Sequence, residues 1–404
     1  MTIQQKDLVK ATVPVLKENG VVLTTHFYNR MLSQNPELRN VFNSGNQHNS
    51  LQPTALAMAV LAYAENIDDP SVLKNAVNRI ANKHVSLDIR PEHYAIVGKH
   101  LLASIGEVLG DAATPELVDA WAVAYDQLAR IFIGAEADLY SGSIAKEGGW
   151  TGWRPFIIKK KVRESKEITS FYLYPSDGGK VRSFLPGQYI SVRLFLPEIN
   201  VFQPRQYSLS SAYNDSYYRI SVKREAGNNL KPEGLVSNRL HHHLKEGDVI
   251  EVAPPAGDFT FDINKESPVF YISGGVGVTP LFSMLETLVK AGSDREITWI
   301  HGARHPEVHA FKHAVAELSD HHGGVDVHTF YDEIELEEAD NEDNLYEGFV
   351  DLEKLNKSIE PGADYYICGP APFIKKHHEF LRSKGVEKSS IHFEEFGPSI
   401  LIVN

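Results

Sequence analysis

The chain has 404 residues, 42% of them hydrophobic and 23% charged, and a formal net charge of -13 at pH 7. This length predicts two or three globular domains. The acidic balance argues against nucleic acid or an anionic membrane as a partner, because both attract basic surfaces. The longest strongly apolar stretch, residues 55–64, is too short to cross a bilayer, and the charges near the N-terminus do not fit a signal peptide. We therefore expect a cytoplasmic protein without a transmembrane segment.

Cys368 is the only cysteine in the sequence. A disulfide within one chain needs two thiols, and a four-thiolate zinc or iron–sulfur site needs four. If the protein moves electrons, we therefore expect organic cofactors or haem as the carriers. Any haem ligand in the N-terminal part must then be a residue other than cysteine.

The sequence changes character twice along the chain. Up to about residue 140, apolar residues recur at helical spacing, and a Gly/Ser-containing break at 141–149 predicts a linker. From residue 150, short apolar runs separated by turns predict a small antiparallel β-barrel. From residue 269, apolar strands alternate with helices, which is typical of an α/β doubly wound parallel sheet. The predicted domains are an all-α domain at 1–143, a barrel domain at 150–262 and an α/β domain at 266–404.

One histidine lies on a helical stripe that should be apolar. In the segment 71–84, the stripe formed by Leu73, Ala76, Val77 and Ile80 continues onto His84 at helical spacing. We therefore expect His84 to face the interior. For an isolated case, the ordinary explanation is a core histidine that is satisfied by a local hydrogen bond.

Four further polar residues share this property in the same helical region. Gln52, Tyr28 and Glu136 each extend an apolar stripe of their own segment, and Tyr94 leads another one after Pro91. A carboxylate costs several kcal/mol to bury without a partner, so Glu136 needs one, and Tyr94 is a candidate. A histidine with a carboxylate behind it is the arrangement that orients an imidazole and strengthens it as a metal ligand.

With these residues, the helical region resembles the globin domain of bacterial and fungal flavohaemoglobins. The resemblance rests on the segments that begin at Thr25, Asn35, Ile80 and Pro91, and it covers the whole first domain. It implies that His84 is the iron ligand of a haem b, that Tyr28 and Gln52 lie on the distal side, and that Tyr94 and Glu136 form a proximal relay. It also implies haem contacts for Leu56, above the ring, and Phe42, at its edge. Lys83 is either a modulator of the haem potential or an ordinary solvated lysine.

A second motif, Arg205-Gln-Tyr-Ser208, fits the recognition of a flavin. An arginine fork suits a pyrophosphate, a tyrosine offers a flat face to the isoalloxazine ring, and a serine hydroxyl suits a ring nitrogen. Alone, this tetrapeptide is equally compatible with an ordinary polar strand. However, it resembles the flavin motif of the ferredoxin-reductase superfamily, as do 186–189 before it and 234–238 after it. The resemblance implies FAD contacts from Tyr189, Arg205, Gln206, Tyr207, Ser208, Val236, Ser237 and Asn238.

A glycine-rich loop, 274–280, separates an apolar strand from a predicted helix. Thr279 is a plausible N-cap and Pro280 a favoured first helical residue, which would leave helix N–H groups free for phosphate. A bare glycine loop is weak evidence, but this one resembles reductase nicotinamide loops, and 368–370 and 396–398 match segments beside the nicotinamide and the flavin. Glu395 is charged where relatives often are not. The resemblance implies nicotinamide or flavin contacts from Gly275, Val276, Gly277, Val278, Thr279, Pro280, Cys368, Gly369, Pro370, Glu394, Glu395, Phe396, Gly397 and Pro398.

The resemblance runs from about residue 5 to 400 in the expected domain order. It implies a flavohaem oxidoreductase in which NADH or NADPH reduces FAD, FAD reduces haem one electron at a time, and haem-bound O2 oxidises nitric oxide to nitrate, with no separate reductase. Two alternatives stay open: a haem–flavin reductase of oxygen or peroxides, and an oxygen-sensing globin tethered to a reductase.

The sequence leaves several features without a function. It does not distinguish NADH from NADPH, although Arg304 would favour a 2′-phosphate if it lay at the adenosine ribose. The acidic stretch 332–347 has no role that we can assign. His309 and His313 have the spacing of a metal-binding pair, but a solvated helix face explains them better, because no third ligand is evident.

Overall fold

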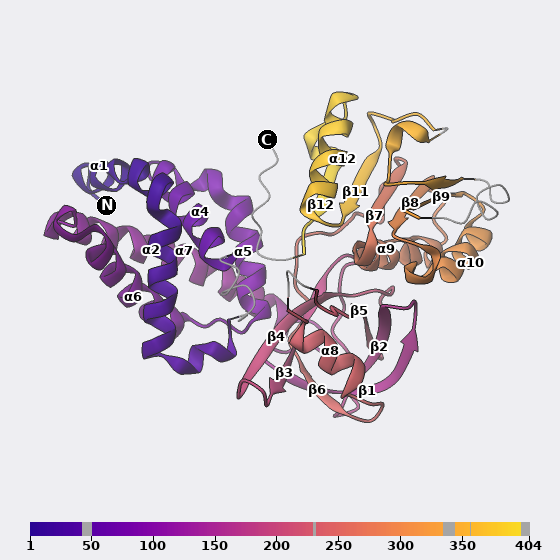
Figure 1. The fold of residues 1–404 in the computed structure, drawn as a ribbon, viewed down its shortest axis with the longest axis horizontal. Coiled ribbons are helices and arrows are strands. Elements are labelled where there is room, and N and C mark those ends of the chain that lie inside the picture. The colour runs from indigo at the N-terminus through magenta and orange to yellow at the C-terminus, as the bar shows by residue number, and fades with distance from the viewer. Residues whose placement is uncertain (43–50, 229–231, 334–343, 356, 397–404) are drawn as a thin grey trace. The chain divides into compact units, whose positions relative to one another are not determined.

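The computed structural model describes residues 1–42, 51–228, 232–333, 344–355 and 357–396. These residues form a helical part, an antiparallel sheet and a parallel sheet, in that order along the chain (Figure 1). The predicted fold class is therefore confirmed. Residues 1–153 and 191–205 belong to one compact unit, and 154–190 and 206–396 to a second one. The three predicted domain boundaries stay a prediction.

The helical part begins its helices at residues that stabilise free backbone N–H groups. Thr2 and Gln5 form a capping box, the Thr114 side chain accepts from the N–H of Leu117, and Pro91 and Pro115 each stand in a first turn. The α-helices are α1 (Ile3–Ala11), α2 (Val13–Gln34), α4 (Leu51–Glu65), α5 (Lys74–Ser86), α6 (Pro91–Leu109) and α7 (Pro115–Ile144). Short 3-10 turns are η1 (Pro36–Asn40), η2 (Pro70–Leu73) and η3 (Gly110–Ala112).

Two expectations about these helices are corrected. Helix α7 continues to Ile144, so the predicted linker starts later than residue 141, because glycine and serine are tolerated in the last turn of a long helix. The stripe of α5 is only partly buried: Leu73, Val77, Ile80 and His84 are half-buried, and Ala76 is exposed. His84 thus faces inward without being enclosed by protein.

The antiparallel sheet has the strand order β4-β3-β6-β1-β2-β5. Its elements are β1 (Arg154–Arg163), β2 (Ile168–Pro175), β3 (Tyr189–Leu196), β4 (Val201–Ser208), β5 (Tyr218–Lys223) and β6 (Val249–Val252), with helix α8 (Leu235–His242) between β5 and β6. Leu209, directly after β4, forms a bridge with Ile220 in β5, the strand at the other end of the order. This bridge joins the two edge strands, so the sheet closes as the predicted small barrel.

The parallel sheet has the order β10-β9-β8-β7-β11-β12, with every described pair of neighbours parallel. Its strands are β7 (Val269–Gly274), β8 (Ile297–Ala303), β9 (Val325–Tyr331), β10 (Leu345–Glu347), β11 (Asp364–Cys368) and β12 (Ile391–Glu394). Its helices are α9 (Val278–Lys290), α10 (Lys312–His322) and α12 (Ala371–Ser383), with short turns η4 (Gly275–Gly277), η5 (Pro306–Val308), η6 (Leu352–Lys354) and η7 (Lys388–Ser390).

Alternate residues of these strands face opposite sides of the sheet. Val269 and Tyr271 pack with α9 and α10, whereas Phe270 and Ile272 pack with α12 (Figure 1). Strand order reverses between β7 and β11, because the chain runs outward from β7 through β8 to β10 and then returns to the other side of β7. Ligands of such sheets bind at the carboxyl ends of the strands near this reversal. The loop after β7 lies there.

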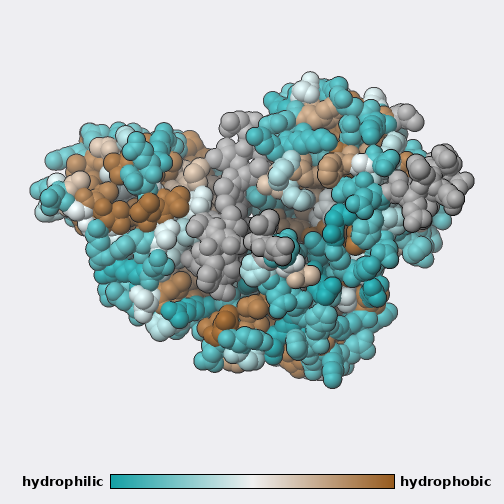
Figure 2. All heavy atoms as spheres, viewed as in Figure 1, coloured by the Kyte–Doolittle hydropathy of each residue, from teal (hydrophilic) through white to brown (hydrophobic). Residues whose placement is uncertain are grey.

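Among the described residues on the face seen in Figure 2, hydrophobic residues gather in separate patches between hydrophilic ones. Within the described residues, none of the helices combines the length and the apolar character that spanning a membrane requires.

Candidate functional site

Three polar side chains from three helices meet in the helical part. Nδ1 of His84, on α5, lies 2.7 Å from Oε1 of Glu136, on α7, and 3.0 Å from the hydroxyl of Tyr94, on α6. The Tyr94 hydroxyl also donates to Glu136. Glu136 is only 2% exposed, so its carboxylate receives these two donors instead of water. Burial, and then the neighbouring Glu136, raise the pKa of Tyr94 above its ordinary value, so its hydroxyl keeps the proton that it donates.

Neighbouring tyrosines fix the backbone around this group. The Tyr125 hydroxyl donates to the carbonyl oxygen of Tyr94 at 2.6 Å, and the Tyr140 hydroxyl donates to that of Ile89 at 2.6 Å. A Cβ on Gly98 would overlap the ring of Tyr125, so α6 and α7 approach closely only because this residue is glycine. Tyr125 and Tyr140 were not predicted as residues of the site. The sequence feature that could have indicated them is a tyrosine on an inward-facing stripe of α7.

A second group surrounds the inward hydroxyl of Tyr28. Tyr28 is 6% exposed, and burial raises its pKa, while a hydrogen bond with Gln52 acts in the opposite direction. The Phe42 ring packs edge-on against Tyr28, with centroids 5.6 Å apart, and Leu56 packs on the same cluster. The structure therefore brings together Tyr28, Gln52, Phe42 and Leu56. Gln52 forms a side-chain hydrogen bond with the Tyr28 hydroxyl.

The donor set around His84 fits a haem. A carboxylate only accepts, so Nδ1 of His84 carries the proton in its bond to Glu136, which leaves Nε2 as the nitrogen able to bind iron. Among the described residues, no group of three or more His, Cys, Asp or Glu side chains could hold a metal ion. A porphyrin supplies four nitrogens itself and needs one protein ligand, which matches a lone histidine. Lys83 precedes His84 on α5 and is half-buried.

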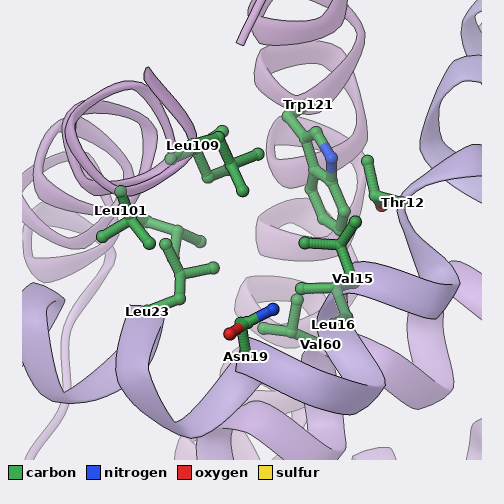
Figure 3. A pocket seen from close by; sticks show the side chains of 11 residues that line it. Thr12, Val15, Leu16, Asn19, Leu23, Val60, Leu101, Leu109 and Trp121 are labelled. Carbon is green, nitrogen blue, oxygen red and sulfur yellow. The ribbon is translucent and has the colours of Figure 1, made fainter. Parts of the chain in front are cut away.

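A separate pocket of the helical part contains none of these residues. Apolar side chains from α2, α4, α6 and α7 point into it, among them Leu23, Leu101, Leu109 and Trp121 (Figure 3). The described residues that line it include two polar side chains, Asn19 and Thr12, whose hydroxyl donates to the Val9 carbonyl oxygen. These lining residues offer no titratable group, so the pocket is not a candidate catalytic site.

The predicted flavin residues lie on two strands and one helix. Tyr189 begins β3, Arg205 to Ser208 end β4, and Val236 to Asn238 form the first turns of α8. The N–H of Leu209 donates to the carbonyl oxygen of Gln188 at 2.9 Å, which places the end of the β4 motif beside the Tyr189 turn. The Arg205 guanidinium donates to the carbonyl oxygen of Pro204 at 2.7 Å. In α8, the Ser237 hydroxyl donates to the Gly234 carbonyl oxygen and accepts from the N–H of Glu225.

The glycine loop forms the connection from β7 to α9, but its helix begins earlier than predicted. The helix starts at Val278 with Gly277 as its N-cap, and the Thr279 hydroxyl donates to the Val276 carbonyl oxygen at 3.0 Å. Thr279 is therefore not the N-cap, and Pro280 is the third helical residue, because the 3-10 turn η4 already winds the chain into the helix. Gly275 has φ +55°, which glycine adopts without strain.

Gly277 brings the loop against the segment 368–370. A Cβ at this position would overlap the carbonyl group of Cys368, at the end of β11. Cys368 is also paired in register with Ser273 and with Glu394 on the neighbouring strands. Burial, and then Glu394, raise the pKa of the Cys368 thiol. Gly274 to Pro280, Cys368 to Pro370 and Glu394 therefore share one edge of the sheet.

The remaining predicted residues follow β12. Glu395 is half-buried and Phe396 is 46% exposed. The predicted contacts of Gly397 and Pro398 lie outside the described residues, as does most of the acidic stretch 332–347. Arg304 pairs with the carboxylate of Glu167.

The expectation that His309 and His313 share a solvated helix face is wrong. His309 precedes α10 and is 7% exposed, so it does not share a solvated helix face with His313. Its Nδ1 lies 2.7 Å from the Tyr331 hydroxyl, and its ring packs on His301, whose Nδ1 lies 2.8 Å from the Ser273 hydroxyl. A left-handed residue, Phe311, separates His309 from the helix, which is why helical spacing did not apply.

Comparison with known proteins finds three family models in chain order. A globin model matches residues 25–132, an oxidoreductase FAD-binding domain matches 155–261, and an oxidoreductase NAD-binding domain matches 271–379. A flavohemoprotein from Bordetella pertussis is 54% identical over 392 residues, 96% of this chain and 97% of that protein. One from Bacillus subtilis is 45% identical over 395 residues, 98% of this chain and 97% of the relative.

Two solved structures are also similar. A flavohemoglobin from Malassezia yamatoensis, whose crystal structure has bound FAD and haem, superposes with a TM-score of 0.86 at 28% identity, covering 98% of this chain and 99% of that one. The flavohem-like FAD/NAD binding domain of a nitric oxide dioxygenase from Vibrio cholerae superposes with a TM-score of 0.56 at 38% identity, covering 61% of this chain and 99% of that one.

Proposed function

The chain belongs to the flavohemoprotein family, and from this premise we propose that it is a nitric oxide dioxygenase with haem b, FAD and NADH or NADPH as cofactors. In the balanced reaction, two nitric oxide and two dioxygen molecules react with one NAD(P)H to give two nitrate ions, NAD(P)+ and one proton. The observation that carries the proposal is the buried contact between Glu136 and Nδ1 of His84, 2.7 Å long. It equips a single imidazole to bind an iron.

FAD, when bound, would supply the conversion of a hydride from the nicotinamide into single electrons, and haem would supply a one-electron iron centre for the chemistry of dioxygen and nitric oxide. Nε2 of His84 would hold the iron. Glu136 keeps the proton on Nδ1 and polarises the imidazole, and Tyr94 orients Glu136. Burial keeps the proton on the Tyr28 hydroxyl, which is hydrogen-bonded to Gln52, so Tyr28 would be available as a hydrogen-bond donor to the dioxygen substrate.

The rest of the chain would bind FAD and the nicotinamide, the cofactors that deliver electrons to the haem. Arg205 would bind the flavin pyrophosphate, Tyr207 and Ser208 would contact the ring, and the first turns of α8 would approach the diphosphate. The loop 274–280 would bind the nicotinamide dinucleotide at the carboxyl edge of the parallel sheet, next to Cys368. The similarity of both parts to FAD-binding and NAD-binding oxidoreductase domains supports these roles.

The test is nitric oxide consumption by the purified full chain, loaded with haem and FAD, in air. We expect rapid consumption that requires NADH or NADPH and yields one nitrate per nitric oxide. Equally rapid nucleotide oxidation without nitric oxide, and no nitrate with it, would favour a reductase of oxygen or peroxides. Haem that is reduced only after an electron carrier is added would favour a sensing globin tethered to a reductase.

A further inference from the structure

Helix α9 holds the backbone of the barrel directly after the flavin motif. The Ser283 hydroxyl donates to the carbonyl oxygen of Ser211 at 2.7 Å, and the N–H of Ala212 donates to Oε2 of Glu286 at 2.7 Å. Ser283 and Glu286 are three residues apart and therefore lie on one face of α9. Ser211 and Ala212 follow Ser208, the last residue of the flavin motif, by three and four positions. One helix face thus binds the carbonyl and the amide of two consecutive barrel residues.

These two bonds are shielded from water. Ser283 and Ser211 are 0% and 2% exposed, and the Glu286 side chain is 15% exposed. The Arg219 guanidinium lies 3.7 Å from Glu286 and over the ring of Phe282, which compensates the carboxylate at this semi-buried position. Lys290 binds the other oxygen of Glu286 from the solvent side at 2.9 Å.

Apolar packing joins the same two elements. Phe259 and Phe261, from the barrel side, share one buried cluster with Leu281 and Leu285 of α9. Gly187, with φ +97°, lies against both the barrel and α9: a Cβ there would lie 2.0 Å from the Phe259 carbonyl oxygen and 2.6 Å from Cε of Met284. This turn of the barrel immediately precedes Tyr189, so α9 packs on the barrel beside two of the predicted flavin segments.

Ordinary interdomain packing would explain these contacts if α9 had no other role. However, α9 is the helix that begins in the loop 274–280, proposed to bind the dinucleotide, and two of its polar contacts with the barrel fix main-chain atoms next to the flavin motif. In hydride transfer the C4–H bond of the dihydronicotinamide breaks and the N5–H bond of the flavin forms. Two electrons move with the hydrogen, and the nicotinamide is left oxidised. Reacting atoms must approach to about 3–3.5 Å for such a step.

We propose that Ser283 and Glu286 form a positioning clamp that holds the dinucleotide loop in register with the flavin, so that hydride transfer takes place at the required distance. The clamp rests on the flavin and nicotinamide half of the proposed function and is independent of the nitric oxide chemistry. The clamp affects the rate of hydride transfer between the bound nicotinamide and the flavin. It does not affect nucleotide binding, because neither residue belongs to the predicted nucleotide contacts.

The test is flavin reduction by NADH in the loaded full chain, followed anaerobically by stopped flow. Ser283→Ala and Glu286→Met each remove one arm, and we expect the limiting rate of flavin reduction to fall by up to about 100-fold, the effect of a misplacement of about 1 Å. FAD content and the Kd for NADH should stay unchanged. The absorbance band that reduced flavin and NAD+ give when they stack should weaken, which a loss of stability alone would not cause.

Matched variants separate the clamp from general effects on α9. Thr287→Val removes a hydroxyl that donates within the same helix, to the Ser283 carbonyl oxygen, and Lys290→Met removes the solvent-side partner of Glu286; both should reduce flavin at the unaltered rate. Glu286→Gln retains an acceptor for the Ala212 N–H without the charge, so it should restore most of the rate lost in Glu286→Met, even if Ser283→Ala fails to fold.

Two results would overturn the clamp alone: limiting rates and stacking bands that match the unaltered chain in Ser283→Ala and Glu286→Met, or rate losses that only follow lost FAD. If neither NADH nor NADPH reduces the flavin of the unaltered chain, the proposed function fails together with the clamp.

Discussion

His84 and Glu136 are joined by a 2.7 Å contact between Nδ1 and a carboxylate that is almost wholly buried. Fifty-two positions separate the two residues in sequence, and α7 places the carboxylate behind the imidazole. The pair therefore leaves Nδ1 of His84 protonated and Nε2 available to bind a metal. The contribution of Glu136 can be tested by a substitution that removes only its negative charge.

Glu136→Gln preserves size and removes the negative charge. Because the imidazole then donates less electron density to iron, we expect haem to stay bound while its reduction potential rises and nitric oxide turnover falls by about 10–100-fold. Potentiometry and nitrate formation measure both. Asp126→Asn is the control: it removes an exposed carboxylate of the same helix, paired with Arg130, and should cost about 0–1 kcal/mol of stability and no turnover. An unchanged potential in Glu136→Gln would remove the residue from the mechanism.

Tyr28→Phe keeps the buried ring and removes the hydroxyl. The Phe42 contact survives, whereas the hydrogen bond with Gln52 is lost. We expect faster dissociation of dioxygen from the reduced protein, by roughly 10-fold for the loss of one hydrogen bond of about 1.4 kcal/mol. Flash photolysis or ligand displacement measures this rate. Flavin reduction by NADH should not change, since no reductase residue is touched. A dissociation rate equal to that of the unaltered chain would rule out the proposed donor.

Gly277→Ala places a methyl group on the Cys368 carbonyl. The loop can accept it only by moving away from β11, so we expect weaker NADH binding and slower flavin reduction. Haem binding and chemical reduction of the haem should be unaffected, because the globin residues are elsewhere in the chain. Gly142→Ala is a suitable control, because the added Cβ would have open space around it. Gly292→Ala is not suitable, because Gly292 has φ +65°, a backbone conformation that is strained for a residue with a side chain. Normal NADH binding in Gly277→Ala would contradict the assignment of the loop.

The buried imidazole of His301 predicts a pH dependence of the parallel sheet. Burial lowers its pKa from 6.5 to about 4. The folded state thus keeps it neutral while the unfolded state takes up a proton below pH 6.5, so stability is fully present above pH 6.5 and is lost as the pH falls toward 4. The loss should be about 2 kcal/mol at pH 5.

Hydrogen exchange of the β8 amides, corrected for intrinsic rates, measures this change within one domain. His301→Gln keeps a hydrogen-bonding side chain beside Ser273 and should flatten the dependence, whereas His242→Gln, at an exposed position, should leave it intact. Equal slopes in both variants would exclude His301 as the titrating group.

The sequence predicted most of the fold where local patterns are strong. Helical spacing up to about residue 140 corresponds to α1 to α7, the short apolar runs from residue 150 to the antiparallel sheet, and the alternation from residue 269 to the parallel sheet with its helices. Strands β1 and β12 were not expected: β1 is rich in lysine, and β12 is only four residues long. Their pairing with β2 and β11 decides their conformation, and pairing between distant segments is not encoded in a local pattern.

The candidate site shows the same division. Glu136 was expected to be buried and to need a partner, because helical spacing places it inward. The spacing did not predict that Tyr125 would bind the Tyr94 backbone or that Ser283 would bind Ser211, since these contacts depend on how separate elements pack. The start of α9 was misplaced because η4, which winds the glycine loop before the helix, has no signature beyond glycine itself.

The buried position of Cys368 makes its thiol unreactive. It is the only thiol in the sequence, it is fully buried at the end of β11, and burial raises its pKa, so at neutral pH it carries no nucleophilic thiolate. Nitrosating agents, peroxide and electrophiles attack thiolates that they can reach. The folded chain therefore presents no accessible sulfhydryl to such reagents, and a second copy of the chain finds none with which to form a disulfide.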